Sequence, residues 1–145
     1  MNHVGRQVQL REAAFDAEKD ARIVVDAEGV VSMANERARA TLGVALRDVG
    51  RRLADIELSY RPVELRSLID QATSERRVVT VTGVERSLPN GVTEVYDVVV
   101  MPLVGPEGDP MGVSITFRDV SNTTKLQTDL AKSRQELETA FEELQ

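Results

Sequence analysis

The sequence predicts an α+β fold in which one five-stranded antiparallel sheet carries its helices on one side. The first observation behind this prediction is the order of segments: a helical pattern, two β-rich segments, several helical stretches, three β-rich segments and a long final helix. The second observation is that only turns separate the last three β-rich segments, and short turns favour antiparallel pairing. Strands gathered in one sheet, with helices segregated from them, define the α+β class.

The composition narrows the chemistry that this fold can support. The chain has 145 residues, of which 41% are hydrophobic, so it can bury a core without a metal or disulfide. The absence of cysteine excludes thiol catalysis, thiolate metal sites and cysteine-linked chromophores. The net charge of -6 disfavours nucleic acid as a partner, and no apolar run approaches the ~20 residues of a membrane span. These observations predict a soluble, cytoplasmic protein without membrane insertion.

The chain opens with a predicted helix followed by a predicted hairpin. Residues 7–19 are rich in helix formers, and Val8 and Phe15 share one face of that helix. Residues 21–35 contain two β-rich runs around a turn at residues 26–29, which is typical of a β-hairpin.

A second helix is predicted directly after the hairpin. Asn35 can start it, because its side-chain oxygen can accept an otherwise unpaired backbone N–H, and Gly43 is the predicted stop. Ala38 and Leu42 are four residues apart and share its buried face. Residues 44–60 have weak periodicity, and we expect short helical turns and loop there.

The second half of the chain changes from a helical to a β pattern. Pro62 is the predicted first-turn residue of a helix that runs to Glu75. The β-rich segments 77–88 and 93–103 are joined around residues 89–91, Pro-Asn-Gly, a strong hairpin signal. A last strand over residues 111–120 alternates apolar with polar or small residues, and its predicted inward positions are Met111, Val113, Ile115 and Phe117.

This last strand runs into a helix over residues 121–145 with no glycine, proline or loop between them. The helix carries a heptad stripe: Thr123, Leu130, Leu137 and Leu144 occupy one position, and Leu126, Ser133 and Ala140 the other. Asp129 and Arg134 stand at g and e positions, where a parallel dimer pairs charges across the seam. The alternative is a single amphipathic helix folded back on the sheet. The predicted homodimer interface comprises Val8, Phe15, Leu126, Leu130, Leu137 and Leu144.

Together these residues resemble a PAS domain. The resemblance is carried by Ile23, Asp26, Gly29, Val31, Asn35, Ala38, Leu42, Gly43, Gly50, Leu53, Asn90, Gly91, Pro102, Gly108, Gly112 and the closing run Arg118-Asp119-Val120-Ser121. It implies three parts: an N-terminal helical cap over residues 1–21, the PAS domain over 22–120 and a signalling coiled-coil helix over 121–145.

A narrower resemblance concerns the parent protein. Residues 54–72 and the ending ELETAFEELQ are similar to the PAS segment of signalling proteins that fuse chemotaxis-type methyltransferase and methylesterase modules. That resemblance implies that the chain is a fragment and that an output domain follows it.

The resemblance also implies a cavity between sheet and helices, and the familiar cofactors can be compared with it. LOV-type flavin and covalent chromophores need a cysteine that the chain lacks, and haem needs a histidine on the helix over residues 62–75. The only histidine is His3, near the terminus, so haem, zinc and other metal sites are disfavoured. A non-covalent flavin or small metabolite stays open.

A tentative ligand pocket follows from the predicted inner faces. Its lining would be Val31, Met33, Leu42, Leu68, Val79, Val81, Val98, Val100, Ile115 and Phe117. A filled hydrophobic core predicts the same residues and is the plainer interpretation. Hydroxyls that could orient a polar ligand belong to Ser32, Thr80, Thr82, Tyr96, Ser114 and Thr116.

The function predicted from the sequence is a non-enzymatic PAS sensory and dimerisation module of a bacterial-type signal-transduction protein, of two-component or chemotaxis-like type. No catalytic residue set can be assembled around His3. The predicted signal relay is Asp119, Val120 and Ser121, between the last strand and the helix, with Asp119 or Ser121 as the helix cap. The alternative function is a structural dimerisation spacer with a filled core and no ligand.

Overall fold

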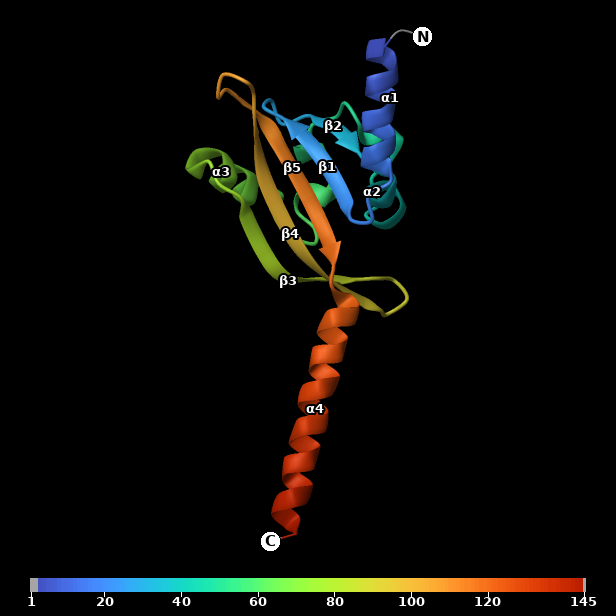
Figure 1. Cartoon of the computed structure of the whole chain (residues 1–145), viewed down its shortest axis with the longest axis vertical. Coiled ribbons are helices and arrows are strands. Elements are labelled where there is room, and N and C mark those ends of the chain that lie inside the picture. The colour runs from blue at the N-terminus through green and yellow to red at the C-terminus, as the bar shows by residue number, and fades with distance from the viewer. Residues whose placement is uncertain (1–2, 145) are drawn as a thin grey trace.

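The computed structural model describes residues 3–144 and contains one five-stranded sheet with helices around it (Figure 1). In chain order the elements are α1 (His3–Asp16), β1 (Ala21–Asp26), β2 (Val31–Ala34), α2 (Glu36–Thr41), the 3-10 turns η1 (Leu46–Asp48), η2 (Leu53–Asp55) and η3 (Glu57–Ser59), α3 (Leu65–Glu75), β3 (Val79–Ser87), β4 (Thr93–Val104), β5 (Pro110–Asp119) and α4 (Ser121–Glu143). The strand order is β2-β1-β5-β4-β3, and every pairing is antiparallel. The α+β prediction is confirmed.

The core lies on one face of this sheet, beneath α2, the 3-10 turns and α3. Alternate residues of β1, β4 and β5 point into it, and Ile23, Val100 and Ile115 have no exposed surface. From the helical side Ala38, Leu65 and Ala72 are equally buried. Because such interiors are close-packed, the cluster fixes how the helices sit on the sheet.

Asn35 is the polar centre of the N-terminal half, and its predicted cap is confirmed. Its Oδ1 accepts the backbone N–H of Ala38 at 2.9 Å and that of Arg22 at 3.0 Å. Its Nδ2 donates to the carbonyl oxygens of Asp20 at 2.9 Å and Phe15 at 3.3 Å. The side chain is fully buried with both polar atoms satisfied, so one residue ties α1, β1 and α2 together.

The structure differs from the predicted helix boundaries at two places. Helix α3 begins at Leu65 rather than Pro62, because Glu64 has an extended backbone (ψ 104) and Val63 packs against the core in the connection from η3. Helix α1 spans His3–Asp16 rather than 7–19, because the chain must turn at residues 17–20 to enter β1. Residues 1–2 and 145 of the predicted cap and coiled-coil segments lie outside the described residues.

Two predicted inward side chains are not in the core. Met111 is 56% exposed, because it precedes Gly112, the residue at which the pairing of β5 with β1 begins. Met33 pairs with Val24, whereas Val31 pairs with Val25, so a bulge at Ser32 turns Met33 to the outer face of the sheet.

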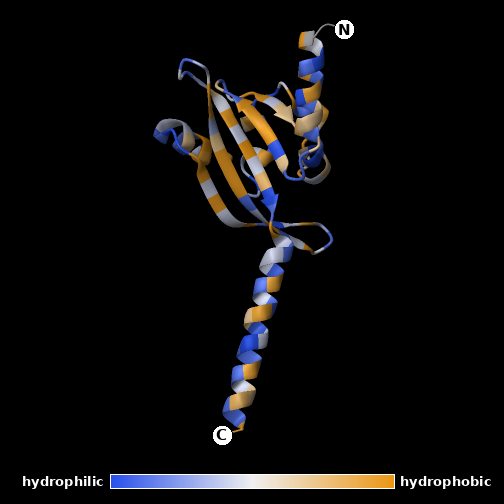
Figure 2. Cartoon of the chain, viewed as in Figure 1, coloured by the Kyte–Doolittle hydropathy of each residue, from blue (hydrophilic) through white to orange (hydrophobic). Residues whose placement is uncertain are grey.

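Helices α1 and α4 extend from opposite ends of the domain (Figure 1). Helix α4 contains no buried residue and points away from the sheet, so it is not folded back on it. Figure 2 shows apolar residues recurring along α4 among hydrophilic ones, and apolar bands along the strands of the sheet. Both helices therefore carry apolar side chains that the rest of this chain leaves exposed.

We expect Gly112→Ala to destabilise the fold strongly. A Cβ there would lie 2.1 Å from the carbonyl oxygen of Val25, and the φ of +146 disfavours a side chain in any case. Because the opposing atom is backbone, β1 and β5 must separate, and urea unfolding followed by circular dichroism should show a loss of at least about 2 kcal/mol.

The matched control is Gly91→Ala, which has a φ of +83 but nothing within 4 Å of its Cβ. It bears only the backbone strain, about 1 kcal/mol. Equal losses in the two variants would contradict the close approach of β1 and β5.

Candidate functional site

The residues predicted to line a pocket are gathered in the hydrophobic core. Apart from Met33, all of them belong to this cluster or pack against it, and Val98, Val100 and Ile115 have no exposed surface. Of the predicted hydroxyls, Tyr96, Ser114 and Thr116 are buried, while Ser32, Thr80 and Thr82 are exposed. The packing agrees with the filled-core interpretation at these positions.

Two cavities open at the rim of this core rather than in its centre. The first, here called the Arg86 cavity, has a volume of about 660 Å³ and lies between residues 42–62 and residues 85–89 at the end of β3. The second, here called the α3 cavity, has a volume of about 870 Å³ and lies between the β1–β2 turn, η2, α3 and the start of β5. Among the predicted lining residues, Leu42 borders the Arg86 cavity, and the other nine border neither.

The α3 cavity combines an apolar floor with a charged rim. Val25, Leu53, Ile69 and Val113 supply the apolar surface. Side chains of both signs stand around it, and these are Asp26, Glu28, Arg52, Glu64, Arg66 and Asp70. An apolar floor with a few polar groups suits a small organic molecule, while the mixed rim selects no single charge.

The Arg86 cavity is more polar, and several of its charges are already paired. Asp48 accepts the backbone N–H of Ala45 at 2.8 Å and a guanidinium N–H of Arg51 at 3.0 Å. Arg86 pairs with Glu94 at 3.3 Å and donates to the carbonyl oxygen of Thr41. The wall of this cavity is therefore bonded both to the end of α2 and to β4.

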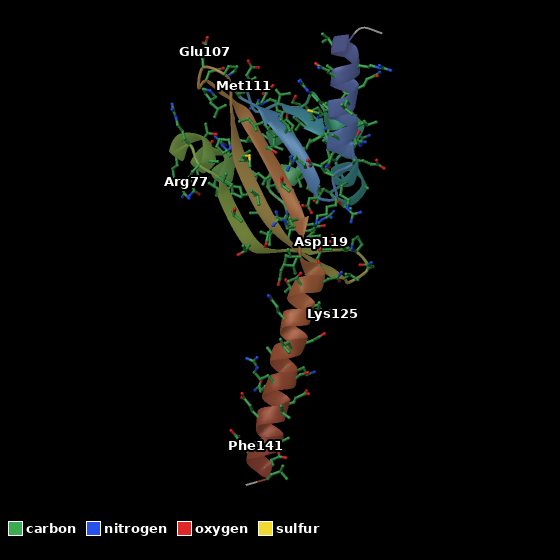
Figure 3. All side chains as sticks on the ribbon, viewed as in Figure 1. Arg77, Glu107, Met111, Asp119, Lys125 and Phe141 are labelled. Carbon is green, nitrogen blue, oxygen red and sulfur yellow. The ribbon has the colours of Figure 1, made fainter. Side chains whose placement is uncertain are left out.

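The junction between β5 and α4 contains the three predicted relay residues. The backbone N–H of Val120 donates to the carbonyl of Val95 at 2.8 Å, and the N–H of Val95 donates to Ser121 Oγ at 2.9 Å. Asp119 Oδ1 accepts the N–H of Ser121 at 2.9 Å. The N-cap residue of α4 is Val120 and no side chain caps the helix, so the prediction of Asp119 or Ser121 as the cap is wrong. Asp119 instead accepts the N–H of Ser121, the first residue of α4, whereas the Ser121 hydroxyl bonds to β4. Figure 3 shows Asp119 at this junction, with Lys125 on α4 beyond it.

Tyr96 lies next to this junction, inside the fold. Its ring meets that of Phe117 edge-on, with centroids 6.1 Å apart and an interplanar angle of 84°. Its hydroxyl donates to Glu94 Oε1 at 3.0 Å. Burial raises the pKa of Tyr96 to about 12; the hydrogen bond to Glu94 and the charges of Glu94 and Asp119 add to this, and Arg86 opposes it.

The sequence places Asp119, Val120 and Ser121 at the β5–α4 junction, as observed, but sequence reasoning missed Arg86 and Glu94. They face each other across the β3–β4 hairpin. An opposite-charge pair at that position was a signal in the sequence, because counting outward from the predicted turn aligns the two residues.

The predicted interface residues are placed on the two projecting helices. Val8 is exposed and Phe15 half-buried on α1, and Leu126, Leu130, Leu137 and Leu144 are exposed along α4. Within residues 3–144 no helix is long and apolar enough to cross a membrane, and the same residues form no cluster of metal-ligating side chains.

Comparison with known proteins assigns this arrangement to a family. The family model of the PAS fold matches residues 15–125, so the chain belongs to the PAS family. No curated protein matches the chain by sequence.

Solved structures show the same fold at low identity. The PAS domain of Bordetella pertussis BvgS has a TM-score of 0.62 and 18% identity, with 89% of this chain and 96% of that chain covered. A sensory box sensor histidine kinase from Vibrio cholerae has a TM-score of 0.55 and 18% identity over 80% and 91%. An RNA-binding light-oxygen-voltage receptor has a TM-score of 0.66 and 16% identity, covering 97% of this chain and 40% of that one.

The environment of Tyr96 predicts a pH dependence of stability at alkaline pH. Because the pKa is raised from 10.0 to about 12 in the fold, the neutral phenol stabilises the folded state. This contribution is complete below about pH 10 and is lost as the pH rises towards about 12. In a Tyr60→Phe variant Tyr96 is the only tyrosine, and we expect its phenolate absorbance to appear with a midpoint near 12.

The control is Tyr60→Phe combined with Tyr96→Phe, in which this part of the stability loss should disappear. A Tyr96 midpoint near 10 in protein that circular dichroism shows to be folded would contradict the predicted environment.

Proposed function

We propose that this PAS domain is a sensory and dimerisation module of a larger signal-transduction protein, and that it passes changes in its core or in a bound ligand through β5 into α4. The observation that carries the proposal is the junction at Val120. It is the only residue between β5 and α4, and its backbone is bonded to β4. A strand coupled so tightly to a helix transmits displacement that a flexible linker would dissipate.

The structural neighbours support a role in signalling. One is described as a sensor histidine kinase and another as the PAS domain of BvgS. We further propose that the parent is a cytoplasmic protein of two-component or chemotaxis-like type, that an output domain follows this chain, and that the module has no enzymatic activity of its own. The kinship with fused methyltransferase and methylesterase proteins is part of this proposal and rests on the sequence resemblance.

The exposed stripe of α4 supports the dimerisation part. Leu126, Leu130 and Leu137 are each more than 60% exposed, which is costly for a helix that stays single. Burial of each leucine in a coiled coil would contribute about 1.5–3 kcal/mol, while Ser133 and Ala140 weaken the seam. A seam of marginal stability can change its pairing at small free-energy cost, as a switchable connector requires.

A structural dimerisation spacer is the second candidate function. The observation in its favour is the packed cluster of Val98, Val100 and Ile115, which leaves the centre of the core without exposed surface. In this version α4 pairs two copies and the domain senses nothing. The two cavities at the rim favour the sensory version.

Native mass spectrometry of freshly purified protein separates the two functions. A stoichiometric small molecule, or a thermal shift with a member of a metabolite library, is expected for the sensor. A ligand-free dimer whose melting temperature does not change with any member of the library would contradict the sensor and support the structural spacer.

The coiled-coil prediction is tested by Leu130→Asp combined with Leu137→Asp. Two charges in the seam should convert a dimer to a monomer, because each would be buried without a partner. Light scattering after size-exclusion chromatography measures the mass of the particle.

The matched control is Thr128→Asp combined with Gln135→Asp, which adds the same charge to the same helix at positions outside the seam. The control should remain dimeric. If the dimer persists after the leucine substitutions, the coiled-coil prediction is wrong and the interface is expected on α1.

A further inference from the structure

A network of polar side chains joins β3 to β4 near the start of α4. Glu94 Oε1 accepts the Tyr96 hydroxyl at 3.0 Å and Arg86 Nη1 at 3.3 Å. The same nitrogen of Arg86 donates to the carbonyl of Thr41, the last residue of α2. The Arg86 and Glu94 side chains are only 26% and 21% exposed, so solvent screens their interaction weakly. The network thus connects α2 with the interior of the sheet.

At one end of the network, Tyr96 contacts both strands to which α4 is attached, β4 and β5. The Tyr96 ring packs edge-on against Phe117 of β5, and Tyr96 pairs in register with Asp119. The preceding residue, Val95, holds the start of α4 with both its N–H and its carbonyl. A displacement of Tyr96 therefore moves the backbone to which α4 is bonded.

The outer end of the network is at a cavity wall. Arg86 borders the Arg86 cavity, together with residues 42–44 that follow α2. A shift of the end of α2, or a molecule in this cavity that bonds the guanidinium, would therefore change the position of Arg86 first.

We propose that Arg86, Glu94 and Tyr96 form a relay through which the end of α2 and the contents of the Arg86 cavity set the stability of the first turn of α4. This route enters the junction from β4, through Tyr96 and Val95, and contacts β5 only where Tyr96 packs against Phe117. It rests on the proposed function only in treating α4 as the output.

The shared acceptor makes the relay work. Without the guanidinium, the Glu94 carboxylate retains only a phenol as partner and turns towards water, because a shielded charge needs compensation. The Tyr96 hydroxyl then loses its acceptor inside the fold. Its ring must shift against Phe117 to regain one, and Val95 shifts with it.

A double-mutant cycle with Arg86→Met and Tyr96→Phe tests the relay on the full chain. The readout is hydrogen exchange at two amides, Val120, which is bonded to Val95, and Thr124, which is bonded to Val120. We expect Arg86→Met to speed both about fivefold, as the loss of roughly one hydrogen bond's net stabilisation implies, relative to the Ile115 amide in the middle of β5. In the Tyr96→Phe background the same substitution should have no such effect, since the hydroxyl link is already absent.

The control is Arg77→Met, which removes an exposed arginine paired with Glu75 and outside the network. It should leave the exchange ratio unchanged. The proposal is overturned if Arg86→Met acts equally in both backgrounds, or if it leaves the ratio at the value of the unsubstituted protein.

Glu94→Gln is the second variant, and it decides the outcome if Arg86→Met loosens the whole fold. It keeps the shape of Glu94 and removes the charge that holds Arg86. A selective increase at Val120 and Thr124 supports the relay. A parallel increase at Ile115 overturns it, because the network would then stabilise the fold without acting on α4. The exchange readout does not depend on a ligand or on a coiled coil, so either proposal can fail while the other stands.

Discussion

The central position of β5 is the constraint on which the rest of the structure depends. The order β2-β1-β5-β4-β3 places the last strand of the chain between the first and the fourth. Neither half of the sheet is joined to the other until β5 is inserted, so the β-core is complete only when its last strand is in place. This strand also contributes Val113, Ile115 and Phe117 to the core, each at most 1% exposed.

This topology makes the end of β5 a favourable place for the output helix that the proposed function requires. An edge strand is hydrogen-bonded to one neighbour only, whereas β5 pairs with β1 on one side and with β4 on the other. A change on either side of the core therefore reaches the same chain end. The hydrogen bonds of Val95 with Val120 and Ser121 attach the start of α4 to β4 as well, so the proposed relay would reach α4 from both strands.

The sequence predicts correctly those elements whose structure depends on a single local rule, such as a helix cap or a hairpin turn. The Asn35 cap, the hairpins and the single five-stranded antiparallel sheet follow from local residues and from the resemblance to a PAS domain. Strict alternation predicts the inner face for Met33, but one extra residue in β2, Ser32, reverses the alternation, and a bulge leaves no reliable trace in a short strand. The helical spacing predicts the start of α3 too early, because Val63 packs against the core from a connection rather than from a helix.

The candidate site was harder to predict than the fold. Each cavity is bordered by segments far apart in the chain, such as residues 42–62 and 85–89, so no local pattern marks it. The core positions that alternation does mark are filled. The relay pair Arg86 and Glu94 was accessible in principle, because the hairpin fixes their register, yet its link to Thr41 depends on tertiary packing.

The two projecting helices are attached to the body by a different kind of interaction from the one that holds the core. The body is an apolar cluster, which resists deformation because its side chains are close-packed. Hydrogen bonds attach the helices: Asn35 to the carbonyl of Phe15 for α1, and Asp119 and Val95 for α4. Such bonds are each worth about 1 kcal/mol net, so each can be exchanged without unfolding the sheet. The domain can therefore keep its shape while the direction or first turn of a helix changes, and that separation of stable body from adjustable attachment is what a signalling module requires.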